Sequence, residues 1–386
     1  MAEAYIVDVV RTAGGRRGGA LAHWHPADMG GQVLDALVAR SGIDPAAIED
    51  VVMGCVGQVG EQSVQVGRNA VLASSLPQSV PAVTIDRQCG SSQQSIQFAA
   101  QAVMSGTQDV VIAAGVESMT RVPMMAPVTL AEQAGIGVGP VSERIKRRFG
   151  VPMFSQFTGA QMIADKYGMT RDELDRFALD SHRKAAAATQ AGAFADEIVP
   201  LPVEGGLHDR DEGIRYDATI EGIGAVKLLA EGGTISAATA SQICDGASAA
   251  LIVNERALKA HGLTPKARIH TLSVSAGDPV IMLEEPIRAT RIALGKAGLS
   301  IGDIDLYEVN EAFAPIPLAW LREIGADPAR LNVHGGAIAL GHPLGATGTK
   351  LMATLVHALK ARGKRYGLQT MCEGGGIANV TIVEAL

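Results

Sequence analysis

The hydrophobic pattern of the chain is a series of short apolar runs, each followed by a polar turn. The chain enters such a run almost at once, at residues 4–10. The clearest example is the apolar run 81–85, which is followed by the small polar segment 86–92 and then by apolar residues at helical spacing. This order predicts a strand, a tight turn and a helix, as in layered α/β proteins.

A faint internal duplication appears when the chain is compared with itself at an offset of about 256 residues. Residues 42–53 align with residues 298–309, each with a helix end, an Asp-containing turn and a strand. Gly106 aligns with Gly363, each before an apolar run, with one residue of slippage between the two matches. We therefore predict two related α/β halves.

The segment between these halves has a different pattern. Strand-like apolar runs are sparse there, and a capping box at Thr170–Glu173 starts a predicted helix that runs to Ala191. Ile243–Asn254 is again typical of a strand, which we assign to the first half. The predicted organisation is a first half of residues 1–117 plus 240–264, a loop-rich subdomain of residues 118–239 that covers the site, and a second half of residues 265–386.

Composition and charge narrow the function classes. The chain has 386 residues, 47% of them hydrophobic and 19% charged, which is typical of a globular protein with a large core. A net charge of -7 argues against a general nucleic-acid binder. The basic residues Arg11, Arg16 and Arg17 are interpreted as part of a solvated turn. No apolar stretch is long enough to span a membrane, and no signal peptide is visible.

Four cysteines are present: Cys55, Cys89, Cys244 and Cys372. They form no CxxC pair and have no histidine at metal-binding spacing, so we expect no metal site. Unpaired cysteines favour a reducing compartment, and we expect the protein to be cytoplasmic. Cys55 and Cys244 are interpreted as small core residues.

Cys89 is the candidate nucleophile, because the predicted strand, turn and helix present its thiol at a helix N-terminus. Unpaired backbone N–H groups and the helix dipole favour a thiolate there. Three further motifs combine a polar or reactive side chain with crowded small residues beside an apolar run. Side chains at the carboxyl ends of strands converge in open α/β sheets. The duplication aligns Gly115 with Cys372, which predicts that the Cys89 and Cys372 motifs face each other. The three motifs are 309–313, 335–343 and 372–376.

Taken together, these residues resemble the thiolase family of acyl-CoA C-acyltransferases along nearly the whole chain. The resemblance implies duplicated α/β halves in an α-β-α-β-α layered arrangement with an inserted loop subdomain. The matching stretches are Val10–Thr12, the Cys89 turn, Glu117–Met119, Arg121–Pro123, Asp245–Ala247, Asn310–Phe313, Gly335–Pro343 and Cys372 with its glycines.

The resemblance also implies roles for five catalytic positions. The Cys89 thiolate would attack the ketone of a 3-oxoacyl-CoA, and Cys372 would protonate the acetyl-CoA enolate that leaves. His342 would activate Cys89 and donate to an oxyanion, with Asn310 holding a water in the same pocket. The N–H groups of Cys89 and Gly374 would form a second oxyanion pocket.

Coenzyme A is the implied co-substrate, and no tightly bound cofactor is expected. Arg215 would lie where the nucleotide part of CoA binds, in the covering subdomain. The implied partners are CoA and a 3-oxoacyl-CoA, and the implied assembly is a homodimer or homotetramer. The residues expected to line the pantetheine tunnel are Ser241, Met282, Ala312 and Phe313.

Two departures from the family pattern bear on the substrate. His334 replaces an asparagine that many thiolases have before the Gly335 loop. We interpret it as a neighbour of the catalytic residues that alters the hydrogen bonding of the loop or the placement of His342. The segment Phe154–Ala160 lacks the His-Met-Gly signature of many acetoacetyl-CoA thiolases. We therefore predict a degradative thiolase that acts on 3-oxoacyl-CoAs other than acetoacetyl-CoA, such as those with a branched or ring-derived acyl group. The alternatives are an acetyl-CoA acetyltransferase and a noncatalytic acyl-CoA or lipid carrier on the same fold.

Overall fold

The computed structural model describes residues 2–386, and it contains one large mixed sheet covered by helices. The strands follow the order β11-β12-β13-β10-β1-β9-β5-β3-β4. The first half supplies five of these strands and the second half supplies four. The two groups meet where Tyr5 and Ile6 of β1 pair antiparallel with Arg268 and Ala267 of β10.

The first half carries the Cys89 turn. Its long parallel pairs are β3 with β4 and β3 with β5, while β9 pairs antiparallel with both β1 and β5. The segment 243–254, predicted as a strand, contains β9, which lies between β1 and β5. The elements are β1 (Tyr5–Thr12), β2 (Gly15–Arg16), α1 (Pro26–Ser41), β3 (Asp50–Gly54), α2 (Val66–Ala73), β4 (Ala82–Ile85), α3 (Ser91–Ser105), β5 (Val110–Ser118), β9 (Cys244–Val253) and α9 (Glu255–His261).

The second half repeats this plan. Its strand β11 pairs parallel with β12, and β13 pairs antiparallel with both β12 and β10. Strands β10, β12 and β13 thus occupy the places of β1, β5 and β9, whereas β11 is an edge strand and its counterpart β3 also pairs with β4. The elements are β10 (Ala267–Ala276), α10 (Glu285–Ala297), β11 (Leu306–Val309), α11 (Pro315–Ile324), α12 (Ala337–Leu340), α13 (Thr347–Ala361), β12 (Tyr366–Glu373) and β13 (Ile377–Ala385).

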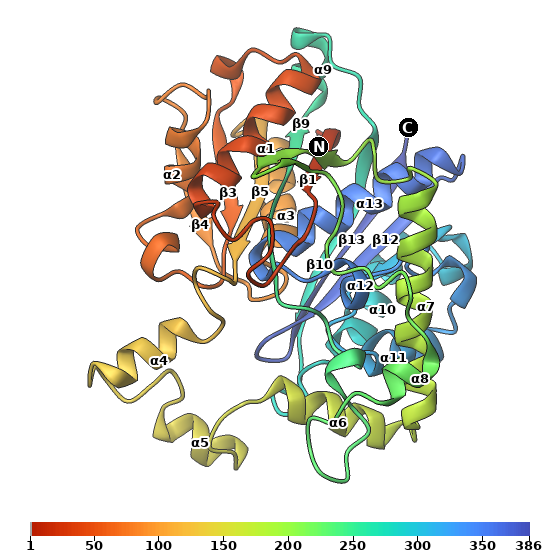
Figure 1. The fold of residues 1–386 in the computed structure, drawn as a ribbon. Helices are drawn as coiled ribbons and strands as arrows, with labels where there is room; N and C mark the ends of the chain where they lie inside the picture. Colours follow the sequence, from red (N-terminus) through yellow and green to blue (C-terminus); the bar gives the residue numbers. More distant parts are fainter. Residues whose placement is uncertain (1) are drawn as a thin grey trace.

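The helices complete five layers (Figure 1). Helices α1 and α2 pack on the outside of the first half, and α10 and α11 pack on the outside of the second. Helices α3 and α13 pack on each other between the halves, and each touches strands of both. They span residues 91–105 and 347–361, so they have equal length at an offset of 256 residues. The α-β-α-β-α arrangement of duplicated halves agrees with the prediction.

The intervening segment is built from helices of different lengths, short strands and loops. Helix α7 begins where the sequence predicts, because the Thr170 side chain accepts a hydrogen bond from the Glu173 N–H. Helices α4 and α5 lie away from the body, whereas α6 and α7 pack on the second half (Figure 1). The elements are α4 (Ala126–Gln133), α5 (Glu143–Phe149), α6 (Gln156–Lys166), α7 (Arg171–Gln190), β6 (Ile198–Val199), β7 (Leu201–Val203), β8 (Gly206–His208) and α8 (Ile220–Gly224).

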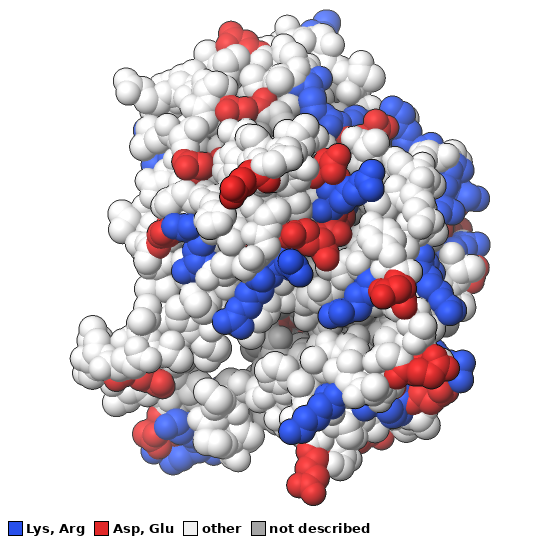
Figure 2. All heavy atoms as spheres, in the orientation of Figure 1, with Lys and Arg blue, Asp and Glu red and all other residues white. Residues whose placement is uncertain are grey.

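The surface carries charges of both signs. In the view of Figure 2 lysines and arginines alternate with acidic residues, and a hollow opens between the body and the segment that carries α4 and α5. Within residues 2–386, none of the helices has the length and apolar character needed to cross a bilayer.

Candidate active site

The predicted nucleophile lies in the turn between β4 and α3. Gln88 has a φ of +48°, and Gly90 caps the helix. This sharp turn directs the Cys89 thiol inward, and only 3% of the residue is exposed. Leu351, Met371 and Leu344 from the second half pack around Cys89.

The electrostatics of Cys89 differ from the expectation. Burial and the nearby Glu373 carboxyl raise the pKa of the thiol to about 12, although the Gln156 amide acts in the opposite direction. The prediction that the helix N-terminus yields a ready thiolate is therefore wrong for the free protein. Cys89 precedes the helix cap and is surrounded by apolar side chains, so loss of solvation outweighs the helix dipole.

Cys372 lies near the end of β12, beside the Cys89 turn. It is fully buried, and burial followed by the charge of Cys89 raises the pKa of its thiol well above the usual range. The following turn also approaches closely, since a Cβ on Gly374 would lie 2.8 Å from Gln88 Oε1. The structure thus brings Cys89, Cys372 and Gly374 together at the boundary of the two halves.

His342 reaches the same boundary from the loop between α12 and α13. Its Nδ1 lies 2.6 Å from the Thr347 hydroxyl oxygen, and that hydroxyl donates to Pro343 O at 2.8 Å. Because the single hydroxyl proton is already used, Nδ1 must donate to Thr347. The other nitrogen, Nε2, is left as a base.

Asn310 follows β11 and faces this base. Its Nδ2 lies 3.4 Å from His342 Nε2, whereas its buried Oδ1 has no hydrogen-bond partner among residues 2–386. The structure therefore brings Asn310 to His342, as the resemblance implies. Within the same residues no hydrogen bond joins His342 to Cys89.

Burial and a neighbouring cation keep the His342 imidazole neutral. Burial, and then the charge of Lys350, lower the pKa of His342 to about 3. Lys350 Nζ donates to Leu340 O at 2.5 Å and to Gly341 O at 3.0 Å, which ties down the chain that leads into His342. Its own charge is balanced by Asp211, 4.0 Å away.

Asp211 belongs to a buried ion cluster that the sequence did not reveal. It holds the Arg11 guanidinium through two hydrogen bonds, and Glu197 holds the Arg11 Nε at 2.6 Å. The interpretation of Arg11 as a solvated loop residue is therefore wrong. It is fully buried because two carboxylates compensate its charge.

His334 lies near this cluster and not against His342. Its ring packs edge-on against Phe194 at 5.7 Å, and the Arg11 guanidinium lies over the same phenyl ring. Burial lowers the pKa of His334 to about 4. The substitution thus changes the packing beside the Arg11 cluster.

Three of the predicted CoA contacts lie together. The Ser241 N–H donates to Ala312 O at 2.9 Å, and Phe313 forms a bridge with Ala240. The Phe313 ring packs edge-on against Phe157 of α6, with ring centres 5.5 Å apart. Ser241, Ala312 and Phe313 thus form one group that contacts α6 of the intervening segment.

Arg215 lines a separate cavity of about 320 Å³ with Arg16 and Gln242. Gln242 also accepts a hydrogen bond from the His342 N–H at 3.1 Å. This cavity therefore connects through one residue to the catalytic loop.

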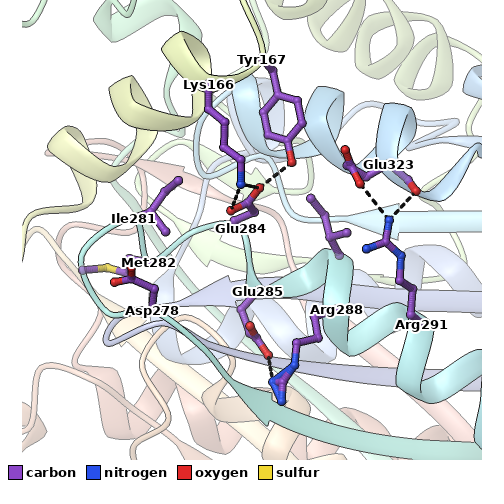
Figure 3. A pocket seen from close by; sticks show the side chains of 11 residues that line it. Lys166, Tyr167, Asp278, Ile281, Met282, Glu284, Glu285, Arg288, Arg291 and Glu323 are labelled. Carbon is purple, nitrogen blue, oxygen red and sulfur yellow. Dashed lines mark hydrogen bonds and ion pairs between the residues drawn. The ribbon is translucent and has the colours of Figure 1, made fainter.

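Met282 lies elsewhere, at another cavity of about 320 Å³ (Figure 3). Its backbone has a φ of +57°, which is unusual for a residue other than glycine. The charged side chains of this cavity pair with one another, as Lys166 does with Glu284 and Arg291 with Glu323. Met282 nevertheless shares a buried apolar cluster with Ala312 and Phe313.

Four residues of the site were not assigned a role from sequence: Gln156, Thr347, Lys350 and Glu373. Thr347 and Lys350 lie at the start of α13, just after the glycine-rich loop that carries His342, and Glu373 adjoins Cys372. A polar residue next to a candidate catalytic residue was the available signal. No group of three or more metal-binding side chains occurs within residues 2–386.

Comparison with known proteins agrees with this geometry. A family model described as the thiolase N-terminal domain matches residues 4–256, and one for the thiolase C-terminal domain matches residues 263–385. The chain is 53% identical to the steroid 3-ketoacyl-CoA thiolase FadA6 of Mycobacterium tuberculosis, over 100% of this chain and 95% of that protein. It is 40% identical to a 3-ketoacyl-CoA thiolase of Yersinia pestis, over the full length of both. The predicted family and fold class are confirmed, and the chain belongs to the thiolase family.

Proposed function

We propose that the protein is a degradative 3-oxoacyl-CoA thiolase that transfers an acyl group to CoA and releases acetyl-CoA. The observation that carries this proposal is a pair of neighbouring buried thiols, Cys89 and Cys372, beside the loop of a neutral histidine, His342, whose Nε2 carries no proton. A noncatalytic carrier has no need for this set. The similarity to 3-ketoacyl-CoA thiolases supports the degradative reaction over acetyl-CoA acetyltransferase activity.

The first half-reaction forms an acyl-enzyme. Cys89 passes its proton to His342 Nε2 as its sulfur bonds to C3 of the substrate. Because the pKa of the thiol is raised and that of the imidazole is lowered, we expect proton transfer to accompany C–S bond formation. The oxyanion then lies near the imidazolium N–H and Asn310.

Carbon–carbon cleavage follows when this intermediate collapses. The C2–C3 bond breaks, its electron pair remains on the acetyl-CoA fragment, and the Cys372 thiol donates a proton to C2. The raised pKa of Cys372 keeps this thiol protonated until that step.

The second half-reaction restores the enzyme. The Cys372 thiolate takes the proton of incoming CoA, whose sulfur attacks the acyl group on Cys89. The Cys89 sulfur leaves and recovers its proton from His342. All protons and electron pairs are thus accounted for without a further cofactor.

The binding of CoA would use the Arg215 cavity and the residues that lead from Ser241 to Met282. We propose that its nucleotide part lies at the Arg215 cavity and that the pantetheine passes Ser241, Ala312 and Phe313 toward Met282. The similarity to a steroid 3-ketoacyl-CoA thiolase, and the absence of the His-Met-Gly signature from Phe154–Ala160, support an acyl group bulkier than that of acetoacetyl-CoA. A ring-derived or branched acyl group is therefore the proposed substrate class. A homodimer or homotetramer in the cytoplasm remains part of the proposal, on the family resemblance and the unpaired cysteines.

The test is the initial rate of thiolysis with CoA across acetoacetyl-CoA and longer linear, branched and cyclic 3-oxoacyl-CoAs. We expect activity to fall at least about a thousandfold in Cys89→Ala and Cys372→Ala. Cys55→Ala is the matched control and should keep its activity, because this buried thiol lies outside the site. Full activity in either test variant would overturn the two-cysteine mechanism. A much higher kcat/KM for acetoacetyl-CoA than for all bulkier substrates would refute the proposed substrate class.

A further inference from the structure

The side chain of Glu373 is buried without a partner beside the reactive thiols. It is 0% exposed, and among residues 2–386 neither of its carboxyl oxygens has a hydrogen-bond partner. A carboxylate buried in this way is costly, and the neutral acid is the form that such a site favours. The mechanism above assigns no role to this group.

The position of the carboxyl is fixed by close packing. Glu373 directly follows Cys372 at the end of β12, and its side chain lies under the start of α3. A Cβ on Gly90 would collide with Glu373 Oε1, so glycine is required there for the carboxyl to fit. Asn379 of β13 donates from Nδ2 to Gly90 O at 3.2 Å, which joins β13 to the start of α3 beside Glu373.

The groups that face Glu373 come from each neighbouring element. Arg87 and Asp86 precede α3, Cys372 lies on β12, and the backbone N–H of Asn379 lies on β13. Arg87 and the Asn379 N–H favour the carboxylate, whereas burial and Asp86 oppose it. Burial dominates and raises the pKa of Glu373 to about 8. The side chain is therefore mainly neutral at pH 7.

A charge on Glu373 acts directly on the chemistry. It raises the pKa of Cys89 and also that of Cys372, since both thiols lie within reach of its field. Each thiol must carry a negative charge at one stage of thiolysis. A carboxylate beside them opposes both ionisations, and a neutral acid does not.

We propose that Glu373 is a positioning residue that works as a neutral carboxylic acid, allowing Cys89 and Cys372 to ionise, and that its carboxylate form suppresses both. The part that concerns the catalytic cycle rests on the proposed thiolase function. The part that concerns Cys89 reactivity does not.

The test compares the wild type with Glu373→Gln, a neutral variant of the same shape. Alkylation of Cys89 by iodoacetamide is followed by peptide mass spectrometry from about pH 6 to about pH 10. We expect equal rates near pH 7. Above about pH 8 the wild-type rate should rise less steeply, leaving Glu373→Gln about tenfold faster at the alkaline end, as one pKa unit of coupling implies.

Two further variants keep the test decisive. Glu308→Gln removes another buried carboxyl, on β11, that does not act on either thiol, and its profile should match the wild type. Arg87→Gln removes a group that favours the Glu373 carboxylate. The pH above which the alkylation rate rises less steeply should therefore be higher in this variant than in the wild type. This second variant answers the question even where Glu373→Gln fails to fold.

Thiolysis measured over the same pH range extends the test to the reaction. We expect Glu373→Gln to keep activity within about threefold at neutral pH and to lose less of it in alkali. Coincident alkylation profiles would overturn the inference. So would low Cys89 reactivity in Glu373→Gln at every pH, because Glu373 would then act as a donor or a structural support. Absence of thiolysis with the expected alkylation profiles would refute the proposed function alone.

Discussion

Helices α3 and α13 are counterparts in the two halves, yet they carry different chemistry into the same layer. Both have 15 residues and lie between the halves. Helix α3 buries glutamines, of which Gln97 donates to Ser273 O and Val380 O in the second half. Helix α13 buries apolar residues such as Leu355 and Leu359. The duplication thus kept the backbone while the buried faces diverged.

The helix N-termini show the same divergence. The start of α3 is preceded by the predicted nucleophile Cys89, whereas the start of α13 is preceded by the loop that presents His342. At the position that corresponds to Cys89, the turn before α13 has Gly345, and a Cβ added there would lie 2.6 Å from Cys55 Cα. The turn before α3 therefore supplies a reactive side chain, whereas the turn before α13 has a glycine that allows the backbone at Cys55 to approach closely.

The contact between the two helices gives the largest expected effect. A Cβ on Gly348 of α13 would collide with the backbone of Gln93 on α3. We expect Gly348→Ala to lower the free energy of unfolding by about 3 kcal/mol, because backbone atoms cannot move aside. Urea denaturation measures this. Gly295→Ala in α10 is the control, since no atom lies within 4 Å of the added Cβ, and it should raise stability by about 0.5–1 kcal/mol. Unchanged stability in Gly348→Ala would contradict the close packing.

A smaller effect is expected where α13 begins. Thr347→Val removes the oxygen that accepts the His342 Nδ1 proton, so the base loses its fixed tautomer. Loss of this buried hydrogen bond, about 1–3 kcal/mol, corresponds to a fall in kcat/KM of about 5-fold to 150-fold. Thr347→Ser keeps the hydroxyl and should remain within about threefold of the wild type. Equal activity of the serine and valine variants would show that the hydroxyl does not hold His342.

The smallest effect is expected at the helix ends, where the halves should behave alike. Gly106 ends α3 with a φ of +76°, and Gly363 follows Arg362 at the end of α13 with a φ of +58°. The added Cβ meets nothing within 4 Å at either site. Each change to alanine should therefore cost about 1 kcal/mol through backbone strain alone. Thermal unfolding of the two variants measures this, and clearly unequal losses would show that one helix end has a further role.

The slippage in the sequence duplication arises just after these helices, because glycine is the first residue of the connection 106–109 but the second residue of the connection 362–365. Between the helix starts and the strands β5 and β12 the offset is 256 residues, but Gly363 falls one residue later than this offset requires. The match in sequence was faint because the buried faces differ, as with Gln97 and its counterpart Ala353. Topology retains the duplication more clearly, since strand pairing depends on backbone hydrogen bonds.

Much of the site could be predicted because its signals are local. The apolar run 81–85, and the polar turn 86–92 that contains Cys89, predict a strand, a turn and a helix within about 25 residues. The other three motifs were visible as polar or reactive residues beside apolar runs, and the family resemblance supplied their roles. The similarity to 3-ketoacyl-CoA thiolases agrees with the predicted degradative activity. The roles of Cys89, His342, Cys372, Asn310 and Gly374 stay predictions until the variants are measured.

The protonation states could not be predicted, because they depend on burial and on neighbours distant in the chain. Cys89 was expected as a thiolate from its helix alone, but second-half side chains bury it and Glu373 opposes its ionisation. Arg11 was expected in solvent, but Glu197 and Asp211 meet it from residues far along the sequence. By itself the sequence determined the local elements, the repeat and the reactive residue types, since these depend on neighbouring residues. Only the tertiary structure decided which residues are charged, because solvation and Coulomb interactions act through space.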